Sequence, residues 1–310
     1  MKQLHATGRP VGDQDWNPEH SSDFYDRSHA SQKYYDRLAA DFNELDEFWQ
    51  NPYDTATWEL ENSLVGQFFQ GPHALLDLGV GFYPHFDGAG QRRLICLDVS
   101  SRSLVVARRL VQPGETAAGY VCADALQMPF PKETFSGIIA GGELINHVCG
   151  HSLLMEIHRA LRPGGRLLLS VGMKWCIDSL YAILDAYIGN HIGYSVTRSE
   201  ANKFLRSPRQ TASVTWEITP ESRLQVFLYS RPDLMKIVAE IGFEISQIRA
   251  LNVASGLIPL PIQQKSQAEG LLGLLTKALI GLDRQVLGRV PGIRWFGGNV
   301  YLVLTKPVRQ

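Results

Sequence analysis

The chain has 310 residues, of which 45% are hydrophobic and 20% charged, with a formal net charge of -1. This composition is typical of a globular protein, and the near-zero charge argues against a global basic field for nucleic acid or anionic membranes. Four cysteines without CxxC spacing argue against a zinc site or disulfide framework, so no metal is expected. No apolar signal core follows Met1 and no run of about eighteen apolar residues occurs, which predicts a cytoplasmic protein without a transmembrane segment.

Two helices are predicted before the first strand. Residues 1–28 are rich in Gly, Pro, Asp, Ser and His and are interpreted as a loose arm. Apolar residues then recur at intervals of three or four, which predicts helices over residues 31–48 and 55–70. We therefore expect residues 1–72 to form an N-terminal arm and helical lid that precede a main domain over residues 73–310.

Strands and helices alternate in the first part of the main domain. The apolar runs predict strands at residues 74–78, 94–99, 119–123, 137–140 and 166–171, with helices at 101–111 and 151–161. Such alternation indicates βαβ units with right-handed crossovers, and hence a parallel sheet covered on both faces.

Two insertions interrupt the later part of this domain, at about residues 174–230 and 253–298. The first begins with an apolar helix over 176–188, and a long insertion of this kind is usually a lid or a substrate-binding piece. A helix at 231–241 and strands at 243–251 and 299–305 belong to the core. In the second insertion, residues 269–287 have helical spacing with a wide apolar stripe. Packing on its own domain is the plain interpretation; a wall for an apolar substrate, or a homodimer or membrane-surface contact through 264–288, are the alternatives.

The segment Asp77-Leu-Gly-Val-Gly81 closes the first predicted strand. A buried strand that ends in an acid and two glycines is typical of a turn that passes close to a ligand. Downstream, a second predicted strand ends in Asp98, within the segment Leu94-Ile-Cys-Leu-Asp-Val-Ser100. The segments Tyr120 to Pro131, Phe135 to Gly142 and Glu156 to Leu169 follow in order.

Together these segments resemble the class I S-adenosylmethionine-dependent methyltransferases, with a methyltransferase type 11-like core. The resemblance implies a Rossmann-like, doubly wound α/β fold with seven strands, mostly parallel with an antiparallel last strand. It also implies S-adenosyl-L-methionine as cofactor and S-adenosyl-L-homocysteine as product. Two positions depart from the family pattern, because Tyr83 replaces the third glycine and Ser136 replaces the acid after Phe135.

The resemblance assigns roles to individual residues. Asp98 is placed to accept hydrogen bonds from ribose hydroxyls, and Asp124 to reach the adenine amino group. Tyr35, in the pattern Tyr35-Asp-Arg-Leu-Ala39, lies on a helix that folds over the cofactor in related enzymes. The full set of implied cofactor-binding residues is Asp77, Gly79, Gly81, Tyr83, Asp98, Val99, Asp124, Ala125, Gly142 and Tyr35. Strand-end capping is the alternative role for the three aspartates.

The family places acceptor-facing groups just after the fourth strand, which here is Gly142 to His151. His147 is the first candidate for a general base, because the unperturbed pKa of imidazole lies near neutrality, and Glu143 is the second. Hydrogen bonding at a helix start, or contact with the cofactor edge, are the alternative roles for His147.

The predicted function is methyl transfer, of the EC 2.1.1 class, by in-line displacement to a small or medium, hydrophobic acceptor. No nucleic-acid partner is expected, because no RNA-binding module is recognisable. The alternatives are a non-catalytic S-adenosylmethionine-binding protein and a protein or RNA methyltransferase. A nicotinamide dehydrogenase is disfavoured, because the sixth position of its Gly-x-Gly-x-x-Gly fingerprint is Pro84.

Overall fold

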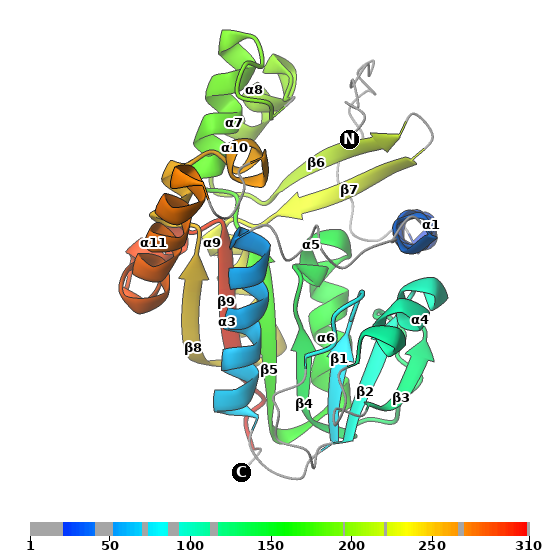
Figure 1. The fold of residues 1–310 in the computed structure, drawn as a ribbon. Coiled ribbons are helices and arrows are strands. Elements are labelled where there is room, and N and C mark those ends of the chain that lie inside the picture. Colours follow the sequence, from blue (N-terminus) through cyan, green and yellow to red (C-terminus); the bar gives the residue numbers. More distant parts are fainter. Residues whose placement is uncertain are drawn as a thin grey trace.

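A seven-stranded sheet forms the centre of the molecule in the computed structural model (Figure 1). The structure describes residues 21–40, 52–69, 74–85, 93–111, 117–194, 196–219, 222–265 and 270–308. The strand order is β3-β2-β1-β4-β5-β9-β8. The strands are β1 Ala74–Leu78, β2 Arg93–Asp98, β3 Ala117–Cys122, β4 Phe135–Ala140, β5 Leu161–Gly172, β8 Glu244–Leu251 and β9 Asn299–Thr305. Only β9 runs against its neighbours β5 and β8, which confirms the predicted fold class.

The chain reverses its winding direction between β1 and β4, and this point fixes the place of the site. β1 pairs in parallel with β2 on one side and with β4 on the other. Open α/β sheets leave a crevice outside the carboxyl ends of the strands at such a switch point. The loops after β1, β2, β4 and β5 therefore meet at one edge of the sheet.

Helices cover both faces of the sheet. On one face, α6 Gly150–Ala160 and α9 Arg231–Ile241 pack Leu153, Ile157 and Leu234 onto the strands, and the short helix α5 Leu144–His147 adds Ile145. On the other face, α3 Pro52–Phe68, α4 Ser101–Leu110 and α11 Leu271–Gln285 contribute Leu64, Leu104 and Ile280. This burial on both sides explains why the strands are nearly continuous apolar runs.

The N-terminal helices differ from the prediction at their ends. α1 spans Ser21–Ala40, so residues 21–28 are helical and not part of a loose arm. Residues 41–48, predicted to continue this helix, lie outside the described part of the chain. α3 begins at Pro52, earlier than predicted, since proline is well tolerated in a first helical turn. α1 lies beside α4 and β7 (Figure 1), and its predicted role as a lid remains a prediction.

Residues between β5 and α9 build a layer above the sheet edge. They form α7 Ile177–Ile188, α8 Arg198–Arg206 and a two-stranded antiparallel sheet of β6 Ala212–Thr219 and β7 Ser222–Leu228. The sequence analysis predicted α7 but neither α8 nor this hairpin. Between β8 and β9 lie η1 Ser255–Leu257, α10 Leu260–Lys265, α11, η2 Leu287–Arg289 and η3 Ile293–Phe296. Among the described residues, no helix combines the length and apolar character needed to cross a bilayer.

Candidate active site

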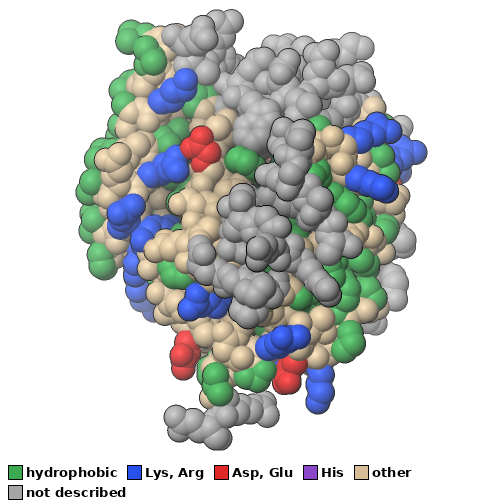
Figure 2. Space-filling view, turned by 60° about the horizontal axis from the view of Figure 1, so that its bottom comes forward, with side chains coloured by type: hydrophobic (Ala, Val, Ile, Leu, Met, Phe, Trp, Pro, Cys, Tyr) green, Lys and Arg blue, Asp and Glu red, His purple; other side chains and the backbone are tan. Residues whose placement is uncertain are grey.

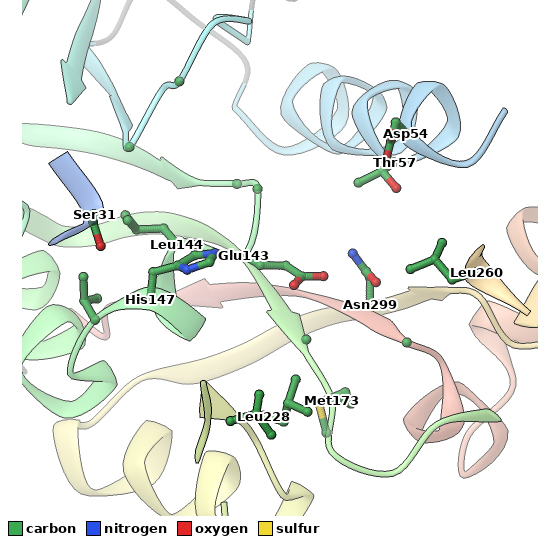
Figure 3. Close-up of a pocket in the computed structure, with 18 of the residues that line it drawn as sticks. Ser31, Asp54, Thr57, Glu143, Leu144, His147, Met173, Leu228, Leu260 and Asn299 are labelled. Carbon is green, nitrogen blue, oxygen red and sulfur yellow. The ribbon is translucent and has the colours of Figure 1, made fainter. Parts of the chain in front are cut away.

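A cavity of about 1070 Å³ opens at the carboxyl ends of β1, β2, β4 and β5. Its walls come from the loops after these strands, from α1 and α3, and from the inner sides of α7, α8 and α10. Figure 3 shows Glu143, Leu144 and His147 near the middle of the cavity, with Asp54 and Thr57 of α3 on one side and Met173 and Leu228 on the other. The cavity therefore joins the switch point of the sheet to the two insertions.

The glycine loop after β1 forms the floor of one end. Gly79 has φ +70° and Gly81 has φ +59°, a left-handed backbone that favours glycine. The backbone N–H groups of Gly79 and Val80 donate to the carbonyl oxygen of Leu97, at 2.8 and 3.1 Å, which ties the loop to β2. A Cβ on Gly81 would meet nothing within 4 Å, so the backbone at this position faces open space. A ligand can thus approach the main chain closely here.

Asp98 lies at the end of β2 directly beside this loop. Its Oδ2 accepts from the Gly81 N–H at 2.9 Å, and its Oδ1 accepts from the Ser100 N–H at 2.8 Å. Burial raises the pKa of Asp98, while these two backbone hydrogen bonds oppose the shift. A carboxylate has about four acceptor positions, so Asp98 retains the capacity to bind further hydroxyl groups.

The remaining predicted residues at this end line the same cavity. Asp124 accepts from the Leu126 N–H at 2.8 Å, and its neighbour Ala125 also faces the cavity. Ser100 Oγ donates to Asp36 Oδ1 of α1 at 2.6 Å, so α1 is anchored beside Asp98. The other predicted residues found in the lining are Tyr35, Tyr83, Val99 and Gly142. Burial raises the pKa of Tyr83 to about 12 and that of Tyr35 as well.

Asp77 differs from this group, because it does not line the cavity and is only 1% exposed. Its Oδ2 accepts from the His85 backbone N–H at 2.8 Å and lies 3.1 Å from His85 Nδ1. The other ring nitrogen of His85 lies 2.9 Å from Glu61 Oε2 of α3. We call this arrangement the Asp77–His85–Glu61 chain. The carboxylate of Asp77 thus has a buried protein partner in place of direct contact with the cavity.

The charge on His85 follows from its two carboxylate partners. Burial alone would lower the pKa of the imidazole, but the charges and hydrogen bonds of Asp77 and Glu61 outweigh burial and raise it to about 10. A protonated ring donates from both nitrogens, one to each carboxylate. Glu61 Oε1 also accepts from the Gly142 N–H at 3.1 Å, so the Asp77–His85–Glu61 chain reaches the loop after β4. Neither His85 nor Glu61 was predicted from the sequence.

The loop after β4 presents Glu143 to the cavity. Glu143 has φ +59°, uncommon for a residue with a side chain, and its N–H donates to Ser170 Oγ at 2.7 Å. Its side chain points toward Asn299 (Figure 3). Burial, with the nearby negative charges of Glu61 and Asp54, raises the pKa of Glu143 to about 7. A side chain held in an unusual conformation with such a pKa is a candidate for proton transfer.

His147 lies one helical turn further, on α5. Its ring meets the ring of Tyr35 edge to face, with centroids 6.5 Å apart. Burial lowers the pKa of His147 to about 4, so the imidazole is neutral at physiological pH. Asn146, which lies between Glu143 and His147 in the sequence, is fully buried. Its side-chain amide donates to the carbonyl oxygen of Gly172 and accepts from the Gly172 N–H, both at 2.9 Å. Asn146 therefore fixes α5 to β5 and does not face the acceptor end.

The far end of the cavity is built by the insertions and is largely apolar. Its side chains include Met173, Ala182, Ile183, Phe204, Leu228 and Leu260. Asp54 of α3 lies on the opposite wall, and burial raises its pKa to about 6. Polar side chains also line the cavity, among them Asp178, Tyr194, Glu200 and Asn299. Within the described ranges, no group of three or more His, Cys, Asp or Glu side chains is arranged to hold a metal ion.

The comparison with protein families agrees with this geometry. A family model described as "Methyltransferase domain" matches residues 76–169, the stretch from β1 to β5 that carries the glycine loop, Asp98 and Glu143. This stretch of the chain therefore carries a methyltransferase domain. The methyltransferase core that the sequence motifs predicted is thereby confirmed.

The curated relatives of this chain are distant. The demethylmenaquinone methyltransferase of Symbiobacterium thermophilum is 28% identical over 140 residues, covering 43% of this chain and 55% of that protein. The ubiquinone/menaquinone biosynthesis C-methyltransferase of Pasteurella multocida is 28% identical over 174 residues, covering 54% and 58%. The chain thus spans a little over half the length of these curated relatives.

A solved structure shares the fold over almost the whole chain. The 1,6-didemethyltoxoflavin-N1-methyltransferase of Burkholderia thailandensis has a TM-score of 0.50 and 13% identity. The match covers 96% of this chain and 94% of that chain. At this identity the likeness concerns the fold.

Proposed function

We propose that this protein transfers a methyl group from S-adenosylmethionine to a small or medium acceptor with an apolar body. One observation carries the proposal: a single cavity runs from Asp98 and Asp124, past Glu143, to the apolar end built by the insertions. The two ends have different chemistry, which suits two different ligands brought together at one point.

The end near the sheet fits the cofactor. The glycine loop exposes its backbone at Gly81, where a polar ligand can approach the main chain. Asp98 retains acceptor positions for ribose hydroxyls, and Asp124 stands beside it at the end of the next strand. Tyr35 of α1 lines the cavity together with these residues. Asp77 has a less direct role, because it holds His85 and so supports the loops around the cofactor.

When bound, S-adenosylmethionine supplies a methyl group activated by its sulfonium sulfur. The protein then has to align the acceptor and, for O, N or acidic C–H acceptors, remove a proton. Glu143 is the group we assign to this task, in preference to His147. A base with a pKa of about 7 is about half ionised near neutral pH and retains useful basicity, whereas His147, with a pKa of about 4, is a weak base.

The acceptor is proposed to be apolar with one polar, ionisable end. Apolar side chains such as Met173, Leu228 and Leu260 surround the body of the molecule, while Glu143 and Asp54 face its polar end (Figure 3). The names of the two curated relatives refer to menaquinone and ubiquinone biosynthesis. An acceptor of quinone type is compatible with the apolar side chains of the cavity and supports the proposal of an apolar acceptor.

The test is a transfer assay with methyl-labelled S-adenosylmethionine and an acceptor panel. The panel pairs aromatic hydroxyl compounds bearing apolar chains of increasing length with polar amines and sugars. We expect label in the apolar hydroxyl compounds, with KM falling as the chain grows. Labelling confined to polar amines and sugars would contradict the acceptor class. Binding of S-adenosylhomocysteine without transfer to any small molecule would favour the alternatives, a non-catalytic binder or a protein or RNA methyltransferase.

A further inference from the structure

We propose that α11 and the segment after it form a docking surface for the headgroup region of an anionic lipid bilayer. The name α11 face is used below for those residues within the range 271–296 that are exposed. The proposal rests on the proposed function only for its purpose, which is access to a lipid-like acceptor. The surface itself is argued from exposure and charge.

The α11 face is apolar where a surface helix is normally polar. Leu271 is 87% exposed and Leu274 57%, and the exposed stripe continues through Leu275 and Leu282 to Val286. The residues at positions 271, 275, 278 and 282 recur at helical spacing, so they lie on one side. The opposite side is buried through Gly273, Thr276, Ile280 and Asp283, and it packs against α3 and β8. The outward leucines are therefore not needed to attach α11 to its domain.

Basic side chains border this stripe. Residues 271–296 contain four Lys or Arg and one Asp or Glu, although the whole chain has a net charge of -1. The one acid, Asp283, is fully buried and accepts the N–H groups of Val253, Ala254 and Ser255. Figure 2 shows basic side chains interspersed with hydrophobic ones along its left side, the side on which α11 lies in Figure 1.

The cationic groups come from several elements that converge here. Burial lowers the pKa of Arg249 on β8, and the positive charges of Arg289 and Arg294 lower it further, so both of these groups lie near Arg249. Lys277 and Arg284 add positive charge on α11, where Arg284 also pairs with Glu59 at 2.6 Å. Leucines flanked by Lys and Arg are the pattern of an element that lies in a membrane interface and attracts anionic lipid.

This surface connects with the acceptor end of the cavity. The inner side of α7 lines the cavity through Ser179, Ala182 and Ile183, while its outer side exposes Leu180, Leu184 and Ile188. η1 contacts both α7 and α11, and Leu260 of α10 lines the cavity. The helices that wall the acceptor site are thus the neighbours of the α11 face (Figure 1). An acceptor leaving a bilayer at this face has a short path to the cavity.

A second copy of the chain is a less suitable occupant. A two-fold dimer places the same patch against itself, so the arginines and lysines of both copies would face one another. Repulsion of like charges at close range disfavours such a contact, whereas an anionic surface complements it. The charge of the α11 face therefore selects the bilayer.

Flotation with lipid vesicles tests the proposal. Wild-type protein is mixed with phosphatidylcholine vesicles that contain or lack phosphatidylglycerol, with neither S-adenosylmethionine nor acceptor present. We expect flotation with the anionic vesicles, weakened at high salt because exposed charges are screened. The double variant Leu274→Ser, Leu275→Ser should partition about tenfold less or worse, because two side chains no longer enter the interface. The matched control Val105→Ser, Met155→Ser removes two similarly exposed apolar side chains on α4 and α6 and should float like wild type.

Three results would overturn the proposal. They are a wild-type protein that does not float, equal flotation of the leucine variant, and a dimer in sedimentation that the leucine variant abolishes and vesicles do not dissociate. All variants are compared at equal thermal stability. A protein that floats but transfers no methyl group contradicts the proposed function alone, and one that transfers without floating contradicts the docking surface alone.

Discussion

Glu143 stands where the two ends of the cavity meet, and its chemistry can be separated from its packing. Glu143→Gln keeps the shape of the side chain but removes the base, so we expect kcat to fall by about 10² to 10⁴ with S-adenosylhomocysteine binding little changed. Because the base acts in its ionised form, kcat/KM of the wild type should rise with pH through about 7. The variant should lose this step. Steady-state rates across pH measure both effects.

The matched control is His147→Gln, four residues along the chain in the same cavity. Since the pKa of His147 is about 4, its replacement should leave the step near pH 7 in place. A profile in which His147→Gln removes the step and Glu143→Gln retains it would assign the proton transfer to histidine.

The Asp77–His85–Glu61 chain makes folding stability depend on pH. The folded-state pKa of His85, about 10, lies above the ordinary value of 6.5, so its ion pairs stabilise the fold fully below about pH 6.5. This contribution is lost as pH rises toward 10, because deprotonation removes the charge between two buried carboxylates. The free energy of unfolding from urea titrations should therefore fall between pH 6.5 and 10.

His85→Gln retains hydrogen-bonding capacity but cannot carry the charge. We expect this variant to be less stable than wild type at pH 6.5 and to show a flatter pH dependence up to pH 10. An equally steep decline in the variant would show that other groups dominate alkaline unfolding.

At the scale of elements, Lys174 joins the first insertion to the sheet. Its side chain is buried after β5 and donates to the carbonyl oxygens of Ser207 and Gln210, at 2.6 and 3.0 Å. Its Nζ also lies 4.8 Å from the ring centroid of Phe204, at the acceptor end of the cavity. Lys174→Met leaves the two carbonyls without their donor, which costs about 1–3 kcal/mol locally.

We therefore expect faster amide hydrogen exchange over residues 198–210 in Lys174→Met, together with a higher KM for the acceptor. Exchange in α4, which packs against β2 and β3 at the other edge of the sheet, serves as the internal control and should not change. Unchanged exchange over 198–210 would show that α8 is held mainly by other contacts.

The same scale shows what the sequence could predict. β1, β9 and α9 have the predicted bounds, because each is an apolar run or stripe closed by a local signal such as the Ser230 N-cap or Gly242. The β6–β7 hairpin was missed, although Val214, Trp216 and Ile218 alternate in sequence, because the many polar residues around it suggested a loop. Its identity depends on pairing between strands, which periodicity alone does not reveal.

The site residues fall into the same two groups, those indicated by the local sequence and those that depend on contacts between distant segments. Asp98, Asp124 and the glycine loop, which line the cavity, could be predicted as candidates because each follows directly after a strand end. Glu61 and His85 were missed, because they are 24 positions apart and meet only after α3 folds over the sheet. The one available signal was an acid at position 61 on the apolar side of a predicted helix, between Trp58 and Leu64. Such a residue needs a buried partner, but the sequence does not identify it.

At the scale of the whole molecule, the sheet and the insertions have separate tasks. The carboxyl edge of the sheet carries the proposed cofactor end, α1 and α3 cover it, and the two insertions supply the acceptor end and the α11 face. Changes in the insertions should therefore alter acceptor choice and membrane association while cofactor binding persists.

Calorimetric titration with S-adenosylhomocysteine tests the central claim most directly. We predict that wild type binds, that Asp98→Asn binds about tenfold to a hundredfold more weakly through loss of a charged hydrogen-bond acceptor, and that Ala182→Trp at the acceptor end binds like wild type. Absence of binding to the wild type, or equal binding by Asp98→Asn, would contradict the assignment of this cavity.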